Sequence, residues 1–190
     1  MRPAEAIRVK RLAKRLEAFV LNPDIATMLK AVYVPTNELA GIAAWHLPIP
    51  ASKRLSLWSA PIMAYRGTRR QPGWTDEDVQ EMWKDVLVDK CEEEFGTYDQ
   101  VREEEFGDQP YYYLAPFYVV EKYRGRGVGG LLLQWAVEKA DAATPPVPMV
   151  LEALPNARPV YAHYGFEPPA SLGKKPNREP LMIRPAKKVE

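Results

Sequence analysis

A strand, a glycine-rich turn and a helix follow one another in the second half of the chain, and this succession limits the possible folds more than any other feature. The strand is expected over residues 111–120, which are rich in aromatic and β-branched side chains, and the helix over residues 131–140, where apolar side chains recur with helical spacing. The turn between them, residues 124–130, reads RGRGVGG. Glycine has no Cβ, so the backbone N–H groups of such a turn can lie close to a ligand, and the following helix adds the positive end of its dipole. We therefore expect an anion site here, most naturally for a phosphate or pyrophosphate.

One known motif that matches this turn belongs to dinucleotide-binding folds. Gly125, Gly127 and Gly130 fit the pattern GxGxxG, and Glu152 stands where an acidic residue would bind the ribose. However, only 38 residues follow Glu152 (190 − 152), which is too few for the rest of a doubly wound sheet. The long segment before the turn would also have no role in such a fold. We therefore expect a different architecture.

The same turn also fits the pattern RxxGxG, through Arg124, Gly127 and Gly129. Downstream, Asn156 is followed by residues 161–166, which read YAHYGF and fit the pattern YxxxGF. Each motif alone is common, but the two in this order are more specific. Together they resemble the acyl-coenzyme A binding core of the GNAT acetyltransferases.

The resemblance covers residues 111–166 and implies an α/β (α+β) fold of GNAT type. Such a fold has a mixed central sheet with helices on both faces, and its fourth and fifth strands splay apart; the fifth is expected over residues 147–154. Upstream, apolar runs at residues 31–34 and 42–47, separated by the turn sequence PTNE, predict an antiparallel hairpin. The family usually opens with a strand, whereas this chain opens with a basic amphipathic helix over residues 4–20. The first strand is therefore expected to be absent, or the sequence to be a truncated form.

Two further helical segments are expected within a single domain that spans residues 1–190. One follows the break at Asn22 and ends at Lys30. The other is an acidic helical insert over about residues 75–108, with Thr75 as the cap of its first helix. From residue 76 to residue 108 there are 14 acidic and three basic residues, so this window carries −11 and the rest of the chain +12. Nucleic acid is therefore not expected as a partner, and the insert either is simply solvated or attracts cationic amine substrates.

The composition limits the location and the partners of the protein. Cys91 is the one cysteine, which excludes an internal disulfide and fits a reducing compartment such as the cytoplasm. The sequence contains neither an apolar run of membrane-spanning length nor the His and Cys spacing of a metal site, so we expect no membrane partner and no metal. The expected partner is a small-molecule amine, and a homodimer is a candidate assembly.

The resemblance implies where the cosubstrate acetyl-CoA binds. Pro116 lies inside the expected strand and cannot donate a ladder hydrogen bond, so a bulge or splay is expected there. The pantetheine arm would lie in the resulting gap, against the backbone of Phe117, Tyr118 and Val119. The pyrophosphate would take the amides of the turn, with Arg126 adding charge; Asn156 either contacts the cofactor or caps a helix. The residues of the turn in this role are Arg124, Gly125, Arg126, Gly127, Val128, Gly129 and Gly130.

The implied reaction is transfer of an acetyl group to an amine by direct attack on the thioester. Tyr161 has the position of the family's tyrosine acid, four residues before Gly165, and would assist the leaving thiolate. Glu152 is our first candidate for the base, because it alone interrupts an apolar strand, where a carboxyl group is expected to have a raised pKa. Glu121, His46 and Tyr113 are further titratable residues, expected at a loop surface, at a strand end and in the core, respectively.

A function of another class stays open. The domain could bind acyl-CoA without turning it over, as a sensor or an assembly module. Such a module needs the glycine turn but has no use for a correctly placed acid, so Tyr161 favours the enzyme.

Overall fold

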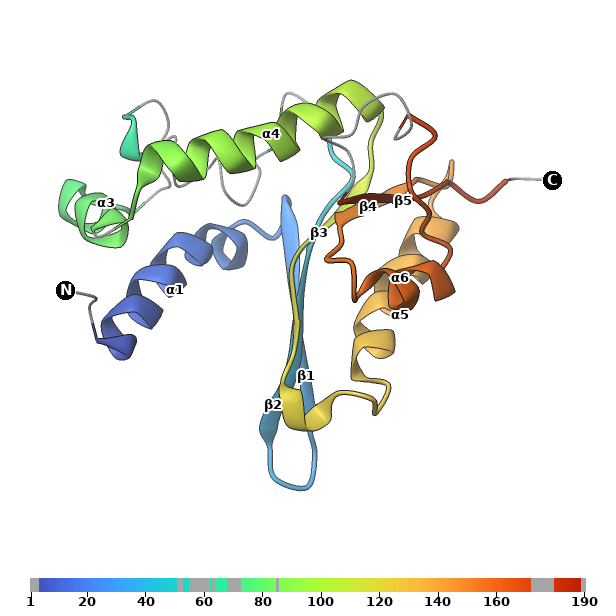
Figure 1. Ribbon diagram of the computed structural model, residues 1–190, viewed down its shortest axis with the longest axis horizontal. Helices are drawn as coiled ribbons and strands as arrows, with labels where there is room; N and C mark the ends of the chain where they lie inside the picture. Colours follow the sequence, from blue (N-terminus) through green and yellow to red (C-terminus); the bar gives the residue numbers. More distant parts are fainter. Residues whose placement is uncertain are drawn as a thin grey trace. The chain divides into compact units, whose positions relative to one another are not determined.

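The strands form one mixed sheet in the computed structural model, which describes residues 4–50, 53–54, 62, 64–67, 73–84, 86–171 and 180–188 (Figure 1). In this part of the chain there are five strands, whose spatial order follows the sequence. The pair β3·β4 is parallel and the other three pairs are antiparallel, so the sheet is not of the doubly wound parallel type. The strands are β1 (Ala26–Tyr33), β2 (Glu38–His46), β3 (Tyr112–Val119), β4 (Met149–Glu152) and β5 (Leu181–Arg184).

The chain divides into two compact units, which we describe separately. The sheet unit comprises Ala26–Ala51 and Gln109–Glu190, and the helical unit comprises Met1–Ile25 and Ser52–Asp108. The acidic segment thus falls into the same unit as the amino-terminal helix. Most of residues 56–70, including Trp58 and Met63, lies outside the described residues. That the whole chain acts as one domain stays a prediction.

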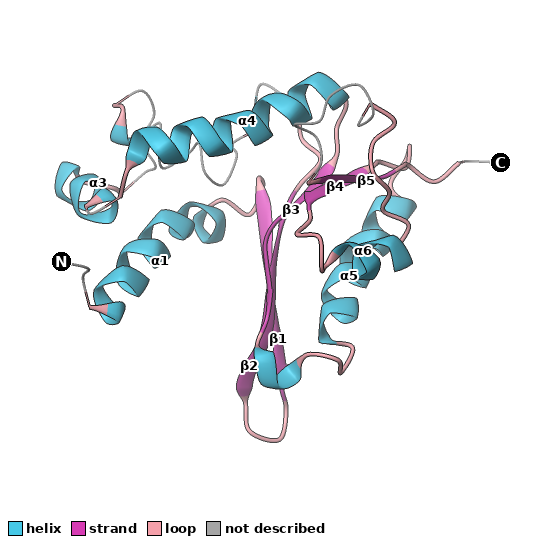
Figure 2. Ribbon diagram, viewed as in Figure 1, coloured by secondary structure: helices cyan, strands magenta, loops and turns pink. Residues whose placement is uncertain are grey.

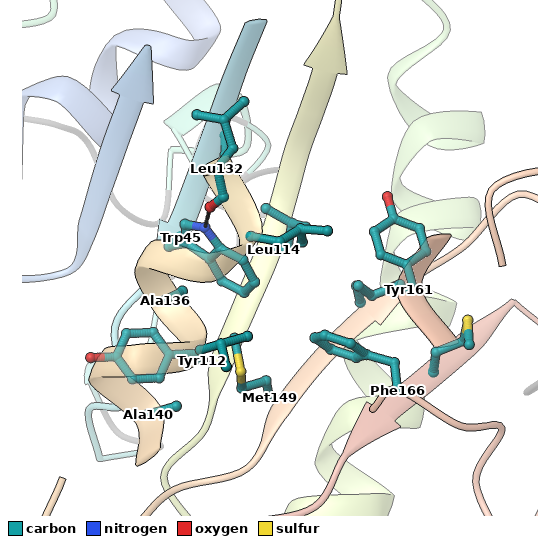
Figure 3. Packing of buried hydrophobic residues seen from close by; sticks show 14 of the residues in the cluster. Trp45, Tyr112, Leu114, Leu132, Ala136, Ala140, Met149, Tyr161 and Phe166 are labelled. Carbon is teal, nitrogen blue, oxygen red and sulfur yellow. Dashed lines mark hydrogen bonds between the residues drawn. The ribbon is translucent and has the colours of Figure 1, made fainter. Parts of the chain in front are cut away.

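The core of the sheet unit lies between one face of the sheet and the helices α5 (Val128–Ala142) and α6 (Arg158–His163). Buried side chains of alternate strand positions meet apolar side chains of both helices (Figure 3). The Trp45 indole Nε1 donates a hydrogen bond to the Leu132 carbonyl at 3.2 Å, so the largest buried side chain also has its polar group satisfied. The main members of this core are Trp45, Tyr112, Leu114, Leu133, Ala136, Met149, Leu151, Tyr161 and Phe166.

A bulge interrupts β3 where the sequence predicts one. Ala43 pairs with Phe117 and Trp45 with Leu114, so one residue of β2 stands opposite both Ala115 and Pro116. The His46 Nε2–H donates to the Ala115 carbonyl at 3.3 Å and supports the bulge from β2.

Past the bulge, β3 and β4 separate. Their ladder joins residues 112–114 to residues 149–151 and includes no later residue of β3. β3 itself continues to Val119, paired with β2 on its other side. The mixed sheet with splayed neighbouring strands confirms the predicted fold class; here the splayed strands are the third and fourth, because no strand precedes α1 (Glu5–Leu21) among the described residues.

The prediction of a helix ending at Lys30 is wrong. Residues 26–30 read ATMLK, which is a good helix-forming sequence, but they form the first half of β1, which pairs along its length with β2 from Ala26↔His46 to Tyr33↔Glu38. Pairing and half-burial against a neighbouring strand outweigh an intrinsic preference of a few tenths of a kcal/mol per residue. The hairpin itself is confirmed, with its turn at residues 34–37.

The helical unit contains α1, α3 (Asp76–Trp83) and α4 (Val88–Phe106) (Figure 2). Thr75 caps α3 as predicted, in a capping box in which its hydroxyl accepts from the Asp78 amide at 3.1 Å and the Asp78 carboxylate accepts from the Thr75 amide at 3.0 Å. No helix in the described part of the chain combines the length and the apolar character needed to cross a membrane.

The buried side of α1 combines the apolar Phe19, which is 4% exposed, with a charged residue. Ile7 and Leu12 are 44% and 41% exposed, whereas Arg11 is only 8% exposed. The Arg11 guanidinium holds the Glu81 carboxylate at 2.7 and 2.9 Å, and Arg15 donates to the Met82 carbonyl. Arginine side chains of α1 are therefore held by polar partners on α3.

Candidate active site

The glycine turn leads directly into the first turn of α5. Gly125 and Gly127 have φ values of +70° and +78°, a left-handed conformation that glycine adopts without steric cost. α5 begins at Val128, three residues before the predicted start, and its first helical hydrogen bond joins the Leu131 amide to the Gly127 carbonyl at 3.1 Å. The amides of residues 128–130 thus precede the helical ladder, and the capping residue Gly127 has no side chain to accept from them. They are donors available to an anion.

The β1–β2 hairpin fixes the segment that enters this turn. The Glu38 carboxylate accepts hydrogen bonds from Lys122 Nζ at 2.7 Å, from Tyr123 Oη at 2.6 Å and from the Thr36 hydroxyl at 2.8 Å. These donors, Lys122 first, lower the pKa of Glu38 to about 2. The Tyr33 ring also lies 5.3 Å from the Tyr123 ring. The hairpin therefore holds the short helix η2 (Glu121–Tyr123) through both the hydroxyl and the ring of Tyr123.

Two arginines flank the glycines of the turn. Arg124 Nε donates to the Val119 carbonyl at 3.2 Å, so this side chain closes the loop between the end of β3 and the turn. Arg126 is exposed, with its guanidinium 6.0 Å from the Tyr123 ring centroid. Arg126 is therefore the arginine whose charge is available to a ligand beside the turn.

Gly129 brings the start of α5 against β3. A Cβ at Gly129 would lie 3.4 Å from the Phe117 ring and 3.7 Å from the Val119 side chain. The ring of Phe117 in turn lies 6.1 Å from the ring of Tyr161 on α6. Phe117 thus contacts the glycine turn on one side and the predicted acid on the other, and the structure brings these separate predictions together.

The YxxxGF motif buries Tyr161 by ending α6 in a particular way. Gly165 has φ +82°, and the Phe166 amide reaches back to the Tyr161 carbonyl at 3.2 Å. This turn places Phe166, only 1% exposed, with its ring 6.1 Å from that of Tyr161. Asn156 is exposed and does not cap α6, whose N-cap residue is Ala157.

Burial determines the chemistry of the Tyr161 phenol. The residue is 7% exposed, and desolvation raises the pKa of its phenol to about 12. Near neutral pH the phenol is therefore protonated and can donate a hydrogen bond from Oη.

Glu152 lies on the other face of the sheet. It is the last residue of β4, half-buried and paired with Leu181. Since successive strand residues face opposite sides and Leu151 belongs to the core with Tyr161, Glu152 faces away from that core. Tyr113 likewise faces away from that core, because the next residue, Leu114, belongs to it. The ring of Tyr113 lies 4.9 Å from the ring of His46, the last residue of β2. Glu121 is exposed at the start of η2, as expected.

The sequence did not reveal one residue that borders the glycine turn. A Cβ at Gly130 would lie 2.4 Å from the Tyr164 hydroxyl, so this hydroxyl rests on the first turn of α5. Tyr164 lines a shallow hollow of about 400 Å³ together with Arg126, Gly127, Gly130, Leu131 and Gln134. The only signal in the sequence is the second tyrosine of YAHYGF, whose distance from Gly130 could not be foreseen.

A family model matches the chain, and solved structures resemble it at low sequence identity. The family model described as an acetyltransferase (GNAT) domain matches residues 77–175, which is just over half of the chain. Among solved structures, arylalkylamine N-acetyltransferase 2 from Aedes aegypti matches with a TM-score of 0.50 and 13% identity, over 88% of this chain and 67% of that one. A GNAT family N-acetyltransferase (YhbS) from Escherichia coli in complex with CoA matches with a TM-score of 0.46 and 14% identity, over 97% of this chain and 78% of that one. A search of curated proteins by sequence found no match.

Proposed function

The chain belongs to the GNAT acetyltransferase family, and we propose that it transfers the acetyl group of acetyl-CoA to the amine of a small molecule by direct attack. The observation that carries this proposal is the contact of one side chain, Phe117, with both halves of the site. On one side lies the glycine turn with its donor amides, and on the other lies the buried phenol of Tyr161. An anion site and a hydrogen-bond donor next to a gap in the sheet would support such a transfer.

The residues at the turn fit the phosphate end of acetyl-CoA. The backbone at Gly127 is open, because a Cβ there would meet nothing within 4 Å, and the first-turn amides and Arg126 supply donors and positive charge. Between β3 and β4 the ladder stops at Leu114, so on that side the backbone of Phe117, Tyr118 and Val119 pairs with no strand among the described residues. That open edge is where an extended pantetheine arm would pair.

When bound, acetyl-CoA would supply an acetyl thioester whose sulfur leaves as a thiolate after the amine attacks the carbonyl carbon. Tyr161 Oη would face the negative charge that develops on sulfur. Its pKa of about 12 exceeds the ordinary thiol value of about 8.5, so complete transfer of the phenolic proton is uphill by roughly 5 kcal/mol. We therefore expect Tyr161 to stabilise the charge by donating a hydrogen bond rather than by giving up its proton.

The attacking amine must lose a proton, and Glu152 is the candidate that would accept it, directly or through a water molecule. Glu152 faces the side of the sheet opposite the core that contains Tyr161, so the two residues could act on different groups of the reaction. A base on one face would receive the amine proton while the phenol on the other face supports the leaving group.

The acceptor is proposed only as a class. The window of residues 76–108 carries −11, but the unit that contains it carries only −3, so the charge by itself does not select a cationic amine. A cytoplasmic location, inferred from the single cysteine Cys91, and a homodimeric assembly are parts of the same proposal.

Calorimetric titration with coenzyme A tests the turn. Gly127→Val places a β-branched residue at φ +78° and puts methyl groups over the donor amides, so we expect binding to be lost. Gly73→Val is the matched control, because Gly73 has φ +82°, equally open surroundings and a place in the helical unit. Both variants carry a similar backbone strain of about 1–2 kcal/mol. Equal coenzyme A affinity in the two folded variants would contradict the assignment of the turn.

A second assay separates the enzyme from a binding module. Release of free thiol from acetyl-CoA is followed over a panel of amines, with mass detection of the acetylated product. We expect release that depends on the amine. Tight coenzyme A binding without thiol release for any amine would instead support a sensor or assembly module.

A further inference from the structure

The hydroxyl of Tyr164 occupies a place next to the first turn of α5 that no assigned role explains. It lies 2.4 Å from the point where a Cβ of Gly130 would stand, which only a glycine at this position allows. The residue is half-buried, and within the described part of the chain no hydrogen bond involves its hydroxyl. A phenol that rests on an amide-rich helix start and makes no hydrogen bond to the described residues is available to a ligand.

Ionic and hydrogen-bonded contacts fix the backbone that carries Tyr164. Arg184 Nε donates to the Tyr164 carbonyl at 3.0 Å, and the same guanidinium binds both carboxylate oxygens of Asp141 at 2.7 and 2.8 Å. Asp141 belongs to the last turns of α5 and Arg184 ends β5. The end of α6 is thereby tied to α5 and to the sheet, so the tyrosine is positioned before any ligand arrives.

The hollow around this hydroxyl has the chemistry of a phosphate site. It is lined by Arg126, by Gly127 and Gly130 of the turn, and by Gln134 one helical turn further on. The described lining residues include no carboxylate, whereas they provide a guanidinium and backbone donors. We propose that the Tyr164 hydroxyl donates a hydrogen bond to a diphosphate oxygen of coenzyme A and so adds a side chain to the amides that bind it; this inference rests on the proposed function.

The experiment measures coenzyme A affinity by calorimetry, without turnover. Tyr164→Phe removes the hydroxyl and keeps the ring, and we expect the affinity to fall roughly tenfold, as for loss of a hydrogen bond to a charged group. Tyr65→Phe, which removes a phenol hydroxyl in the helical unit, is the control and should leave the affinity unchanged. If wild-type protein fails to bind coenzyme A, the proposed function fails; if it binds and Tyr164→Phe binds equally well, only the present inference fails.

The choice of ligand identifies the group that is contacted. Dephospho-coenzyme A retains the diphosphate and lacks the 3′-phosphate, so its affinity should fall by the same factor in Tyr164→Phe. Pantetheine lacks both, and its binding, followed by ligand-observed NMR, should not change. A loss confined to coenzyme A would show a 3′-phosphate contact and overturn the proposal, as would an equal loss for pantetheine, which would show a structural role.

A rescue variant uses the short distance at Gly130. In Tyr164→Phe the ring carbon Cζ stands 3.6 Å from the site of a Cβ at position 130, which is an ordinary contact. Adding Gly130→Ser to Tyr164→Phe therefore introduces a hydroxyl close to the lost one, and we expect most of the tenfold loss to be recovered. Adding Gly130→Ala instead should recover nothing. Equal affinity of the two double variants would overturn the proposal.

Discussion

Tyr161 owes its chemical character to the turn that follows it. Gly165 in the left-handed conformation returns the chain so that Phe166 packs against the phenol, and Phe117 lies against it from β3. An exposed tyrosine would have a pKa near 10, whereas burial raises that of Tyr161 to about 12. The motif therefore produces a hydrogen-bond donor that stays protonated, rather than an acid tuned to neutral pH.

Removing the Tyr161 hydroxyl should separate catalysis from binding. Tyr161→Phe keeps the ring contacts with Phe117 and Phe166, so we expect little change in the melting temperature or in coenzyme A affinity. Turnover should fall by at least about 100-fold, because support for the developing thiolate is lost. Steady-state kinetics with the best amine of the panel, together with calorimetry, measures both. Full turnover in the variant would make Tyr161 purely structural.

Spectrophotometric titration checks the state of the phenol. The folded-state pKa of about 12 lies above the ordinary value for tyrosine, so the protonated form is favoured by the fold. Its contribution to stability is fully present below about pH 10 and is lost as the pH rises through about 12. The difference between the tyrosinate absorbance of the wild type and that of Tyr161→Phe should therefore appear only near pH 12. A difference that appears near pH 10 would contradict the burial argument.

Only some residues of the candidate site could be identified from the sequence. The sequence pointed to the glycine turn and to Tyr161 because each belongs to a short local pattern whose physical role depends on near neighbours in sequence; their roles stay predictions. Glu38 and Tyr164 were not identified, because their partners are distant in the chain: Glu38 meets Lys122 across 84 residues, and Tyr164 lies on Gly130. No local pattern encodes such contacts.

Helices and strands were likewise predicted correctly where their cause is local in the sequence, and missed where it is a tertiary contact. Thr75 and Pro116 act through the backbone next to them, so the cap of α3 and the bulge in β3 were correctly predicted. β1 was partly missed, because its composition favours a helix and only the pairing with β2 makes it a strand. The burial of Arg11 on α1 was missed for a related reason, since its partner Glu81 is on α3.

The ion pair between Arg184 and Asp141 should contribute measurably to the stability of the sheet unit. Its side chains are only 16% and 23% exposed, and Arg184→Met leaves the Asp141 carboxylate and the Tyr164 carbonyl without these donors. We expect the free energy of unfolding to fall by about 2 kcal/mol. Lys90→Met, at the exposed pair Lys90–Glu93, is the control and should cost less than about 1 kcal/mol. Urea denaturation measures both, and equal effects would show that the Arg184 contacts add nothing.

At the scale of the whole molecule, the acidic window is largely balanced within its own unit. Met1–Ile25 and Ser52–Asp108 together hold 14 basic and 17 acidic residues, so the unit carries −3 although residues 76–108 alone carry −11. The balance is made by direct contacts, such as Arg11 with Glu81, Lys14 with Asp78, and Arg66 with Asp89 and Glu92. The charge asymmetry read from the sequence is therefore much weaker at a distance than its window suggests.

This balance predicts weak electrostatic attraction of substrates. Changing Glu92, Glu93 and Glu94 to Gln should alter kcat/KM for a cationic amine by less than about threefold at low salt, because strong steering, which is worth 10- to 1,000-fold, needs an unbalanced field. Whatever effect remains should disappear as added salt shortens the screening length to about 10 Å at 0.1 M. The measurement compares both proteins over a salt series with a neutral amine as the control. A tenfold or larger loss at low salt, specific to the cationic amine, would show that the acidic window attracts the substrate despite its ion pairs.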